Sequence, residues 1–316
     1  MTDKAGFDGL RLGHATDVDA RTGCTVLLGP FRAACDVRGF ATGSREIDAL
    51  SSQHIVPRVN ALLLTGGSAF GLAAADGVVG WLEERDIGYD VGVARVPIVP
   101  AAVIFDLRAG RSDRRPDAAM GRAACDDARP WPWAEGRVGA GTGATVGKLL
   151  GPEHASPGGF GCWIENGPSY NVLAAAVVNA VGDVLDAGGR VIAGARDAHG
   201  RFIDATRRLR EEGITGHFGR VTETPPGTNT TLAVVATDAP LTRDALAALA
   251  RMVGSAMARR ISPVNTPFDG DIVFALSTAP AASTVEPGEL LALGAAATWT
   301  LEQAIERAVT AESPSP

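Results

Sequence analysis

The sequence is poor in cysteine, and the cysteines that it has are scattered. Its 316 residues include four of them, at Cys24, Cys35, Cys125 and Cys162. None forms a CxxC pair and no histidine lies at metal-ligand spacing from any of them, so neither a metal site nor a disulfide framework is predicted. A long chain with so few cysteines fits a reducing compartment, and we expect the protein in the cytoplasm.

Long apolar runs and basic clusters are also scarce in the sequence. No stretch of about 18 residues is free of glycine and charge, which excludes a membrane-spanning helix. Residues 1–9 are polar and lack the apolar core of a signal peptide. The net charge is −7, and no lysine or arginine block alternates with aromatic residues. We therefore expect neither a membrane nor a nucleic acid as a partner.

What the sequence does contain is typical of a large α/β protein. Apolar residues make up 46% of the chain and charged residues 21%. Short apolar runs predict strands, and the stretches 243–259 and 287–309 predict long helices. The runs 22–28 and 32–37 flank a Gly-Pro turn and predict a β-hairpin. We expect strands packed between helical layers in one compact unit.

A glycine-rich turn joins a predicted strand to a predicted helix early in the chain. Residues 61–64 are apolar, Thr65-Gly66-Gly67-Ser68 follows, and a helical pattern continues to about residue 84. Unpaired N–H groups at such a helix start suit an anion or an oxyanion. The glycines could equally serve only to let helix and strand pack closely. The GxxxxGK[ST] and GxGxxG patterns are absent here, so a nucleotide loop is not predicted.

The stretch before residue 230 has the character of a loop that ends at a buried strand. Pro225-Pro226-Gly227 cannot continue a regular element, and 231–237 is an apolar, β-branched run. One interpretation of the junction is an ordinary turn with local side-chain hydrogen bonds. The other is a cut between Asn229 and Thr230. A cut would leave Thr230 with a free α-amine beside its hydroxyl, so that the nucleophile carries its own base.

Four further polar residues stand where predicted elements begin or end. Lys148 follows a glycine-rich run, and its spacing does not match a phosphate loop, so a solvated lysine is the default interpretation. Asn179 ends an apolar strand and is either an oxyanion donor or a turn residue. Asp269 and Asp271 flank a glycine before the buried run 272–277. They could ligate a metal, hold a neighbouring ammonium or hydroxyl, or cap the loop.

Taken in order, these stretches resemble the DmpA-type self-processing aminopeptidases, which include the β-peptidyl aminopeptidases and the nylon-oligomer endohydrolases. The resemblance runs from residue 9 to residue 300. Five ordered motifs are far more specific than any one of them. They are TGGSAFGL at 65–72, GAG at 139–141 with GK at 147–148, VNAVG at 178–182, NTT at 229–231 and DGD at 269–271.

The resemblance implies a fold and a processing step. Such proteins are α/β, four-layer αββα sandwiches of the DmpA/ornithine-acetyltransferase type. They are made as one inactive chain that cuts itself, so a single N-terminal-nucleophile domain, 1–316, is expected to separate into chains 1–229 and 230–316. Relatives assemble into tetramers, and we carry over a homotetramer of processed heterodimers as an expectation. No metal and no organic cofactor is implied.

The resemblance also assigns roles by position. Thr230 would attack the substrate amide carbonyl and form an acyl-enzyme that water clears. Lys148 would tune the protonation of Thr230, and Asn179 would help to form the oxyanion hole. Asp269 and Asp271 would position the amine and hydroxyl of Thr230. The substrate cleft would be lined by Gly66, Gly67 and Ser68.

Two features distinguish this chain within that resemblance. Aminopeptidases of the family typically carry serine as the nucleophile with Ser-x-Glu in the later loop, whereas Thr230 with Asp-Gly-Asp resembles the nylon-oligomer branch. A tyrosine that relatives often place in the site corresponds to Phe105, which has no hydroxyl. Any role that depends on that hydroxyl must pass to another group.

The sequence therefore predicts an amidohydrolase for linear amides, such as 6-aminohexanoate oligomers, short peptides or amino-acid amides. An ornithine-type acetyltransferase shares the architecture and the threonine, and it would pass the acyl group to an amine instead of water. An aminopeptidase for natural peptides is a further alternative. The alternative from a different class is an unprocessed, non-catalytic scaffold in which Thr230 never becomes a chain terminus.

Overall fold

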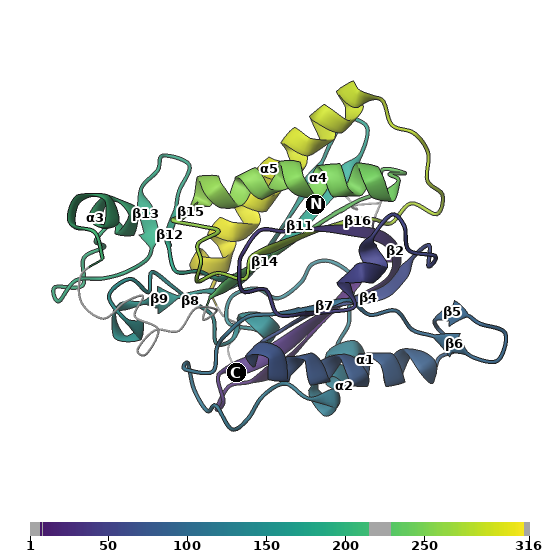
Figure 1. Ribbon diagram of the computed structural model, residues 1–316, viewed down its shortest axis with the longest axis horizontal. Coiled ribbons are helices and arrows are strands. Elements are labelled where there is room, and N and C mark those ends of the chain that lie inside the picture. Colours follow the sequence, from purple (N-terminus) through teal and green to yellow (C-terminus); the bar gives the residue numbers. More distant parts are fainter. Residues whose placement is uncertain (1–6, 8, 215–228, 313–316) are drawn as a thin grey trace.

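The computed structural model describes residues 7, 9–214 and 229–312. Two mixed β-sheets lie face to face, and a pair of helices covers the outer face of each (Figure 1). This arrangement confirms the four-layer αββα sandwich predicted from the sequence. The loop 225–228, which the sequence predicts to be irregular, lies outside the described residues.

The two sheets share one long strand, β2 (Thr22–Val37). Its first half pairs with β1 and β4, and its second half pairs with β16. The remaining strands of the first sheet are β1 (Arg11–Asp17), β4 (Val59–Thr65), β7 (Ala101–Val103) and β3 (Ser44–Arg45). The second sheet contains β10 (Gly159–Asn166), β11 (Asn171–Asn179), β14 (Thr230–Thr237) and β16 (Ile272–Ser277).

The predicted hairpin at residues 22–37 is wrong, and β2 shows why. A Gly-Pro pair normally marks a turn, but here the chain continues in the same direction with only a break in register between Leu28 and Phe31. The two apolar runs do not pair with each other, because each has a partner strand in a different sheet. The local signal for a turn was outweighed by these long-range pairings.

Helices bury apolar stripes against the outer sheet faces. On one side lie α4 (Arg243–Arg260) and α5 (Pro287–Thr310), and on the other α1 (Ala74–Glu83) and α2 (Ala118–Asp126). In α4, the side chains at helical spacing face the sheet as predicted, and Thr242 caps the helix by accepting a hydrogen bond from the N–H of Ala245.

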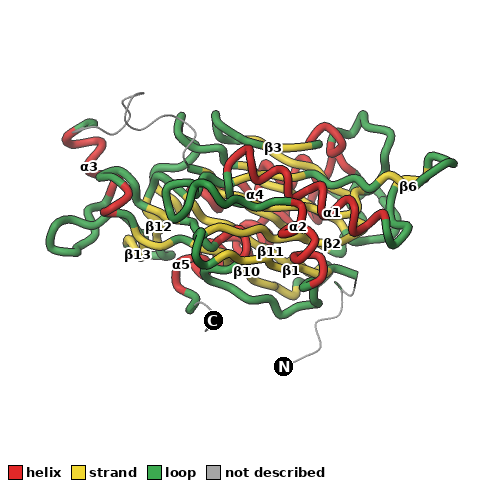
Figure 2. Tube along the Cα trace, turned by 90° about the horizontal axis from the view of Figure 1, so that it is seen from below, coloured by secondary structure: helices red, strands yellow, loops and turns green. Residues whose placement is uncertain are grey.

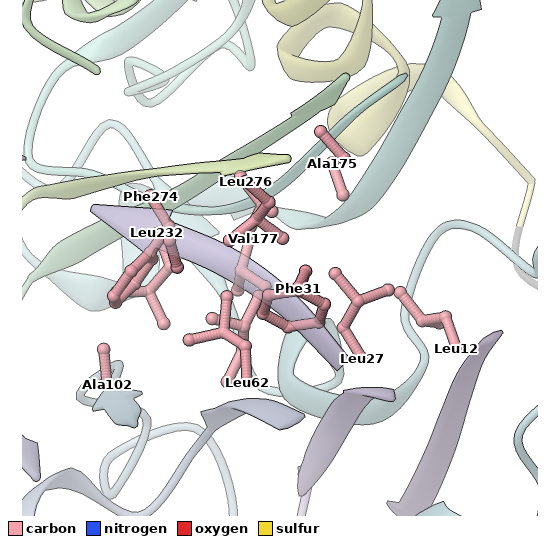
Figure 3. Close-up of a cluster of buried hydrophobic side chains, with 14 of the residues drawn as sticks. Leu12, Leu27, Phe31, Leu62, Ala102, Ala175, Val177, Leu232, Phe274 and Leu276 are labelled. Atoms are coloured by element: carbon pink, nitrogen blue, oxygen red, sulfur yellow. The ribbon is translucent and has the colours of Figure 1, made fainter. Parts of the chain in front are cut away.

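The central core fills the space between the two sheets (Figure 3). Leu27 and Leu62 project from the first sheet, and Val177, Leu232 and Phe274 project from the second. All five are almost completely buried. The other sheet covers one face of β16 and helices cover the other. This confirms the prediction that its unbroken apolar sequence forms a strand buried on both faces.

Smaller elements lie at the two ends of the sandwich (Figures 1 and 2). One end carries β12 (Asp183–Leu185), β13 (Val191–Ala193), β15 (Ile261–Ser262) and α3 (Ala205–Glu212). The other carries the hairpin of β5 (Tyr89–Asp90) and β6 (Arg95–Val96). A short pair, β8 (Thr145–Val146) and β9 (Ser156–Pro157), is also present. The described residues further contain the 3₁₀ helices η1 (Ile47–Leu50), η2 (Ser68–Ala73), η3 (Gly139–Gly141) and η4 (Pro152–His154).

The sheet topology brings three sequence-distant segments together. β14 runs antiparallel to β11, so its first residue, Thr230, lies opposite the last residue of β11, Asn179. β14 runs parallel to β16, so the loop that enters β16 lies beside the start of β14. The predicted site residues from positions 179, 230 and 269–271 therefore meet at one end of the second sheet.

Candidate active site

The peptide bond between Asn229 and Thr230 lies at the centre of this meeting point. Thr230 is almost fully buried, with 3% of its surface exposed. Its hydroxyl Oγ1 lies 2.5 Å from the carbonyl oxygen of Asn229 and donates a hydrogen bond to it. The backbone N–H of Gly270 donates to the same oxygen at 2.8 Å. This carbonyl is thus polarised by a fixed donor while a hydroxyl is held against it.

Gly270 approaches Thr230 so closely because it has no side chain. A Cβ atom at position 270 would lie 2.7 Å from Oγ1 of Thr230 and 2.7 Å from the carbonyl oxygen of Ala41. Sequence reasoning singled out the two aspartates around this glycine and missed the glycine itself. The signal was present, because a glycine at the entry of a buried strand often marks a close backbone approach.

Asn179 lies opposite Thr230 on the neighbouring strand and makes hydrogen bonds to three other parts of the site. Its side-chain oxygen accepts hydrogen bonds from Nζ of Lys148 at 2.7 Å and from the N–H of Thr145 at 3.1 Å. Its Nδ2 donates to the carbonyl oxygen of Phe105 at 3.2 Å. One hydrogen of the amide group is therefore engaged, and the second is available to a developing oxyanion.

Lys148 is held in place by its backbone. The preceding Gly147 adopts φ 71°, a left-handed conformation that favours glycine, and a Cβ there would lie 1.9 Å from the nitrogen of Ala195. The N–H of Lys148 donates to Val181 at 2.9 Å. Burial lowers the pKa of Lys148 to about 7, although nearby carboxylates, Asp269 first among them, oppose the change. A lysine with this pKa is partly a neutral amine at neutral pH and can accept a proton.

Asp269 and Asp271 are both buried and both bind backbone N–H groups. Asp271 accepts from the N–H of Thr231 at 2.6 Å and from that of Asn265 at 3.0 Å. Asp269 accepts from the N–H and hydroxyl of Thr266 at 2.9 and 2.5 Å. Burial and the charge of Asp269 raise the pKa of Asp271 to about 7. Asp271 therefore fixes the start of β14 through Thr231, next to the predicted nucleophile.

The predicted turn at Gly66, Gly67 and Ser68 reaches the site through one carboxylate. The N–H of Gly67 donates to Asp106 at 2.7 Å, and a Cβ at Gly66 would lie 2.2 Å from the same carboxylate. The N–H of Ser68 instead donates to Ile104 at 3.0 Å. Asp106 was not predicted as a site residue, although it directly follows Phe105 in the sequence.

A cavity of about 220 Å³ opens beside these groups. Phe105, Lys148 and Asn229 line it, together with Asp106. Gly66, Gly67 and Ser68 are not among its lining residues, although Gly66 and Gly67 lie against the lining residue Asp106. The cavity therefore connects the candidate cut site to solvent-accessible space large enough for a slender acyl chain.

Other kinds of catalytic site find no support in the described part of the chain. Within residues 7, 9–214 and 229–312, no group of three histidine, cysteine, aspartate or glutamate side chains is arranged to hold a metal ion. Burial raises the pKa of each of the four cysteines, which disfavours a thiolate nucleophile. Among the described helices, none is long and apolar enough to cross a bilayer.

Comparison with known proteins identifies the family of this chain. The family model described as peptidase family S58 matches residues 3–315. This chain belongs to peptidase family S58. It is an amide-bond hydrolase, and the family assignment favours hydrolysis over the acetyltransferase and scaffold alternatives.

Individual relatives of this S58 peptidase carry two kinds of name. An uncharacterised aminopeptidase of Mycobacterium leprae is 39% identical, over 98% of this chain and 91% of that protein. A 6-aminohexanoate-oligomer endohydrolase of Agromyces sp. is 34% identical, over 86% of this chain and 74% of that protein. Among solved structures, the L-aminopeptidase D-Ala-esterase/amidase of Ochrobactrum anthropi aligns with a TM-score of 0.73 at 20% identity, over 95% of this chain and 84% of that one. That protein has a variant of the Ntn-hydrolase fold, and this chain shares its fold.

Proposed function

We propose that this S58 peptidase cuts itself between Asn229 and Thr230 and then uses Thr230 as the nucleophile of a linear-amide hydrolase. The observation that carries the proposal is the pair of contacts on the Asn229 carbonyl. The Thr230 hydroxyl lies 2.5 Å from its oxygen, and the Gly270 N–H donates to that oxygen at 2.8 Å. An ordinary turn does not require a buried nucleophile and a buried donor on one peptide carbonyl.

Self-cleavage would follow from these contacts. Oγ1 of Thr230 attacks the carbonyl carbon of Asn229, and the Gly270 N–H stabilises the negative charge that develops on the oxygen. The hydroxyl proton passes to the neutral amine of Lys148, and the amide nitrogen of Thr230 is protonated as the C–N bond breaks. Water then hydrolyses the resulting ester, which leaves a carboxylate on Asn229 and a free α-amine on Thr230.

Turnover would use the same threonine after the cut. Oγ1 attacks the substrate carbonyl carbon, and the new α-amine or Lys148 takes its proton. The amine half of the substrate leaves with a proton, and an acyl ester on Thr230 remains until water hydrolyses it. Asn179 offers its second amide hydrogen to the oxyanion, and Asp269 and Asp271 hold the segments on either side of the nucleophile.

The remaining parts of the proposal concern substrate, assembly and place. The names of the relatives support two substrate classes: short peptides and amino-acid amides on one side, and 6-aminohexanoate oligomers on the other. The combination of Thr230 with Asp269 and Asp271 favours the second. We further propose a homotetramer of processed heterodimers in the cytoplasm, formed from the chains 1–229 and 230–316.

Replacement of the nucleophile tests the proposal. Thr230→Val keeps the shape of the side chain and removes the hydroxyl, so we expect an uncut chain near 32.5 kDa on a denaturing gel and no amidase activity. The matched control is Thr237→Val at the other end of β14, which is also buried and should be processed normally. If Thr230→Val were still cut at the same bond, Thr230 would not be the nucleophile.

A further inference from the structure

The cavity beside Thr230 has an uneven distribution of charge. Arg21, Arg108 and Lys148 contribute three basic side chains to its lining, and Asp106 is its only carboxylate among the described residues. Asp106 is already engaged, because it accepts hydrogen bonds from the Thr22 hydroxyl at 2.6 Å and from a backbone N–H at 2.7 Å. No lining carboxylate in the described part of the chain is therefore free to bind an ammonium group.

The two arginines at the mouth have no partner among the described residues. Neither Arg21 nor Arg108 makes an ion pair or a side-chain hydrogen bond there, and both are exposed. Arginines close by in sequence are paired: Arg111 binds Asp113 at 2.7 Å, and Arg114 binds Asp17. Carboxylates are thus available in this region but neutralise other arginines. In a chain of net charge −7, the described residues therefore leave two positive charges at the mouth of the cavity without a partner.

The backbone fixes Arg21 at this position. Its φ of 53° lies in the left-handed region, where glycine would be less strained. Gly143 packs against it so tightly that a Cβ there would lie 2.1 Å from the carbonyl oxygen of Arg21. The pKa of Arg137 is lowered first by burial and then by the charge of Arg21, so a second cation lies within electrostatic range of it. The chain therefore places a long cationic side chain at a position where glycine would have less backbone strain.

We propose that Arg21 and Arg108 bind a carboxylate of the substrate, so that this enzyme prefers linear amides with a carboxylate at the end of a flexible chain. Neutral amides, and peptides offering only a free amine to this cavity, are the poorer substrates. The inference deepens the proposed function and rests on it. It adds a specificity that the name aminopeptidase, carried by some relatives, does not suggest.

The physical argument is one of complementarity. An arginine binds a carboxylate through two parallel N–H···O bonds, which fixes geometry as well as charge. An ammonium group at the same mouth would face the like charges of Arg21 and Arg108, and among the described lining residues only the engaged Asp106 carries a negative charge. The apolar side chains of Phe105, Pro152 and Pro157 line the same cavity and suit the methylene chain between carboxylate and amide. Because the arginines are exposed, added salt should weaken the preference.

Matched substrates isolate the carboxylate. One pair is N-glutaryl-p-nitroanilide and its terminal carboxamide, which places the charge on the acyl side. The other pair is N-hexanoyl-6-aminohexanoate and its carboxamide, which places it on the leaving amine. Each carboxamide keeps the shape and removes the charge, so the ratio of kcat/KM within a pair measures carboxylate recognition, and the two pairs show on which side it acts.

Variants of the two arginines complete the design. We expect processed wild-type enzyme to favour the acid about tenfold in at least one pair, the size of one good charged contact. Arg21→Gly with Arg108→Gln should bring that ratio close to one while the carboxamide rates stay nearly unchanged. Arg21→Gly also relieves the left-handed backbone, so folding should not suffer. Arg111→Gln, which removes a paired arginine of the same segment, is the control and should keep the wild-type ratio.

The inference fails if wild-type enzyme shows no preference in either pair, or if the double variant retains the preference. A processed protein that hydrolyses neither these four compounds nor a 6-aminohexanoate oligomer or an amino-acid amide would refute the proposed function instead. Calorimetry on uncut Thr230→Val protein then still decides the inference: glutarate should bind more tightly than glutaramide, and the two arginine substitutions should abolish the difference. Equal binding of the two compounds would overturn it.

Discussion

Replacing Gly270 with alanine should slow self-cleavage without unfolding the protein. The added Cβ would lie 2.7 Å from Oγ1 of Thr230, well inside van der Waals contact. Either the hydroxyl rotates away from the Asn229 carbonyl or the loop moves back and lengthens the 2.8 Å hydrogen bond from the Gly270 N–H. Both responses damage the geometry that the cut requires.

The expected size of the effect follows from the donor that is lost. Removing one oxyanion donor in other enzymes slows the reaction about 10²–10³-fold, or about 3–4 kcal/mol in the barrier. Overpacking a tight site costs about 1–3 kcal/mol in stability, which most domains survive. Self-cleavage of Gly270→Ala should therefore take at least about 100 times longer than in wild type.

Purification of freshly made protein, followed by timed denaturing gels, measures the rate of the cut. Circular dichroism and the midpoint of thermal unfolding monitor the fold. Gly288→Ala is the matched control, because no atom lies within 4 Å of its added Cβ, and it should be cut at the wild-type rate. A well-folded Gly270→Ala protein that is cut as fast as wild type would refute the role assigned to this N–H.

Two further predictions concern the charged groups. Because burial lowers the pKa of Lys148 to about 7, its amine is protonated below that pH and cannot act as a base. Amidase rates should therefore rise about tenfold per pH unit up to pH 7 and level off above it. Lys148→Arg, which stays protonated, should be slow across the whole range, and a flat wild-type profile between about pH 5 and 9 would contradict this role. Asp271→Ala leaves the buried N–H of Thr231 and the half-buried N–H of Asn265 without acceptors, at about 1–3 kcal/mol for the buried group and less for the other. We expect a lower midpoint of chemical unfolding and loss of turnover, whereas wild-type amidase rates would exclude Asp271 from positioning the nucleophile.

The sequence predicts the elements of this fold better than their pairing. Apolar periodicity locates the helices that became α4 and α5 to within one residue at their C-terminal ends, because their buried stripes span many turns. The same local reasoning fails for β2, where Gly29-Pro30 has the composition of a turn. The partners of β2 in β4 and β16 lie 28 to 245 residues away along the chain, and no local pattern encodes those pairings.

The candidate site divides in a similar way. Motif order pointed to Asn179, Thr230 and Asp271, and the sheet topology brings the three segments together. Gly270 contributes a backbone N–H group and the space that a side chain would otherwise fill. The residue type alone reveals neither contribution. That Arg21 and Arg108 have no partner among the described residues depends on where the carboxylates of those residues lie, so only the folded chain can display it.

The intact mass of the C-terminal fragment during turnover tests the central claim most directly. The account predicts two chains, the smaller beginning at Thr230, and a transient mass increase equal to the acyl group when a slowly hydrolysed amide is added. Fragmentation should place that group on Thr230. An active enzyme that remains a single chain, or one whose acyl group resides on another residue, would contradict the account.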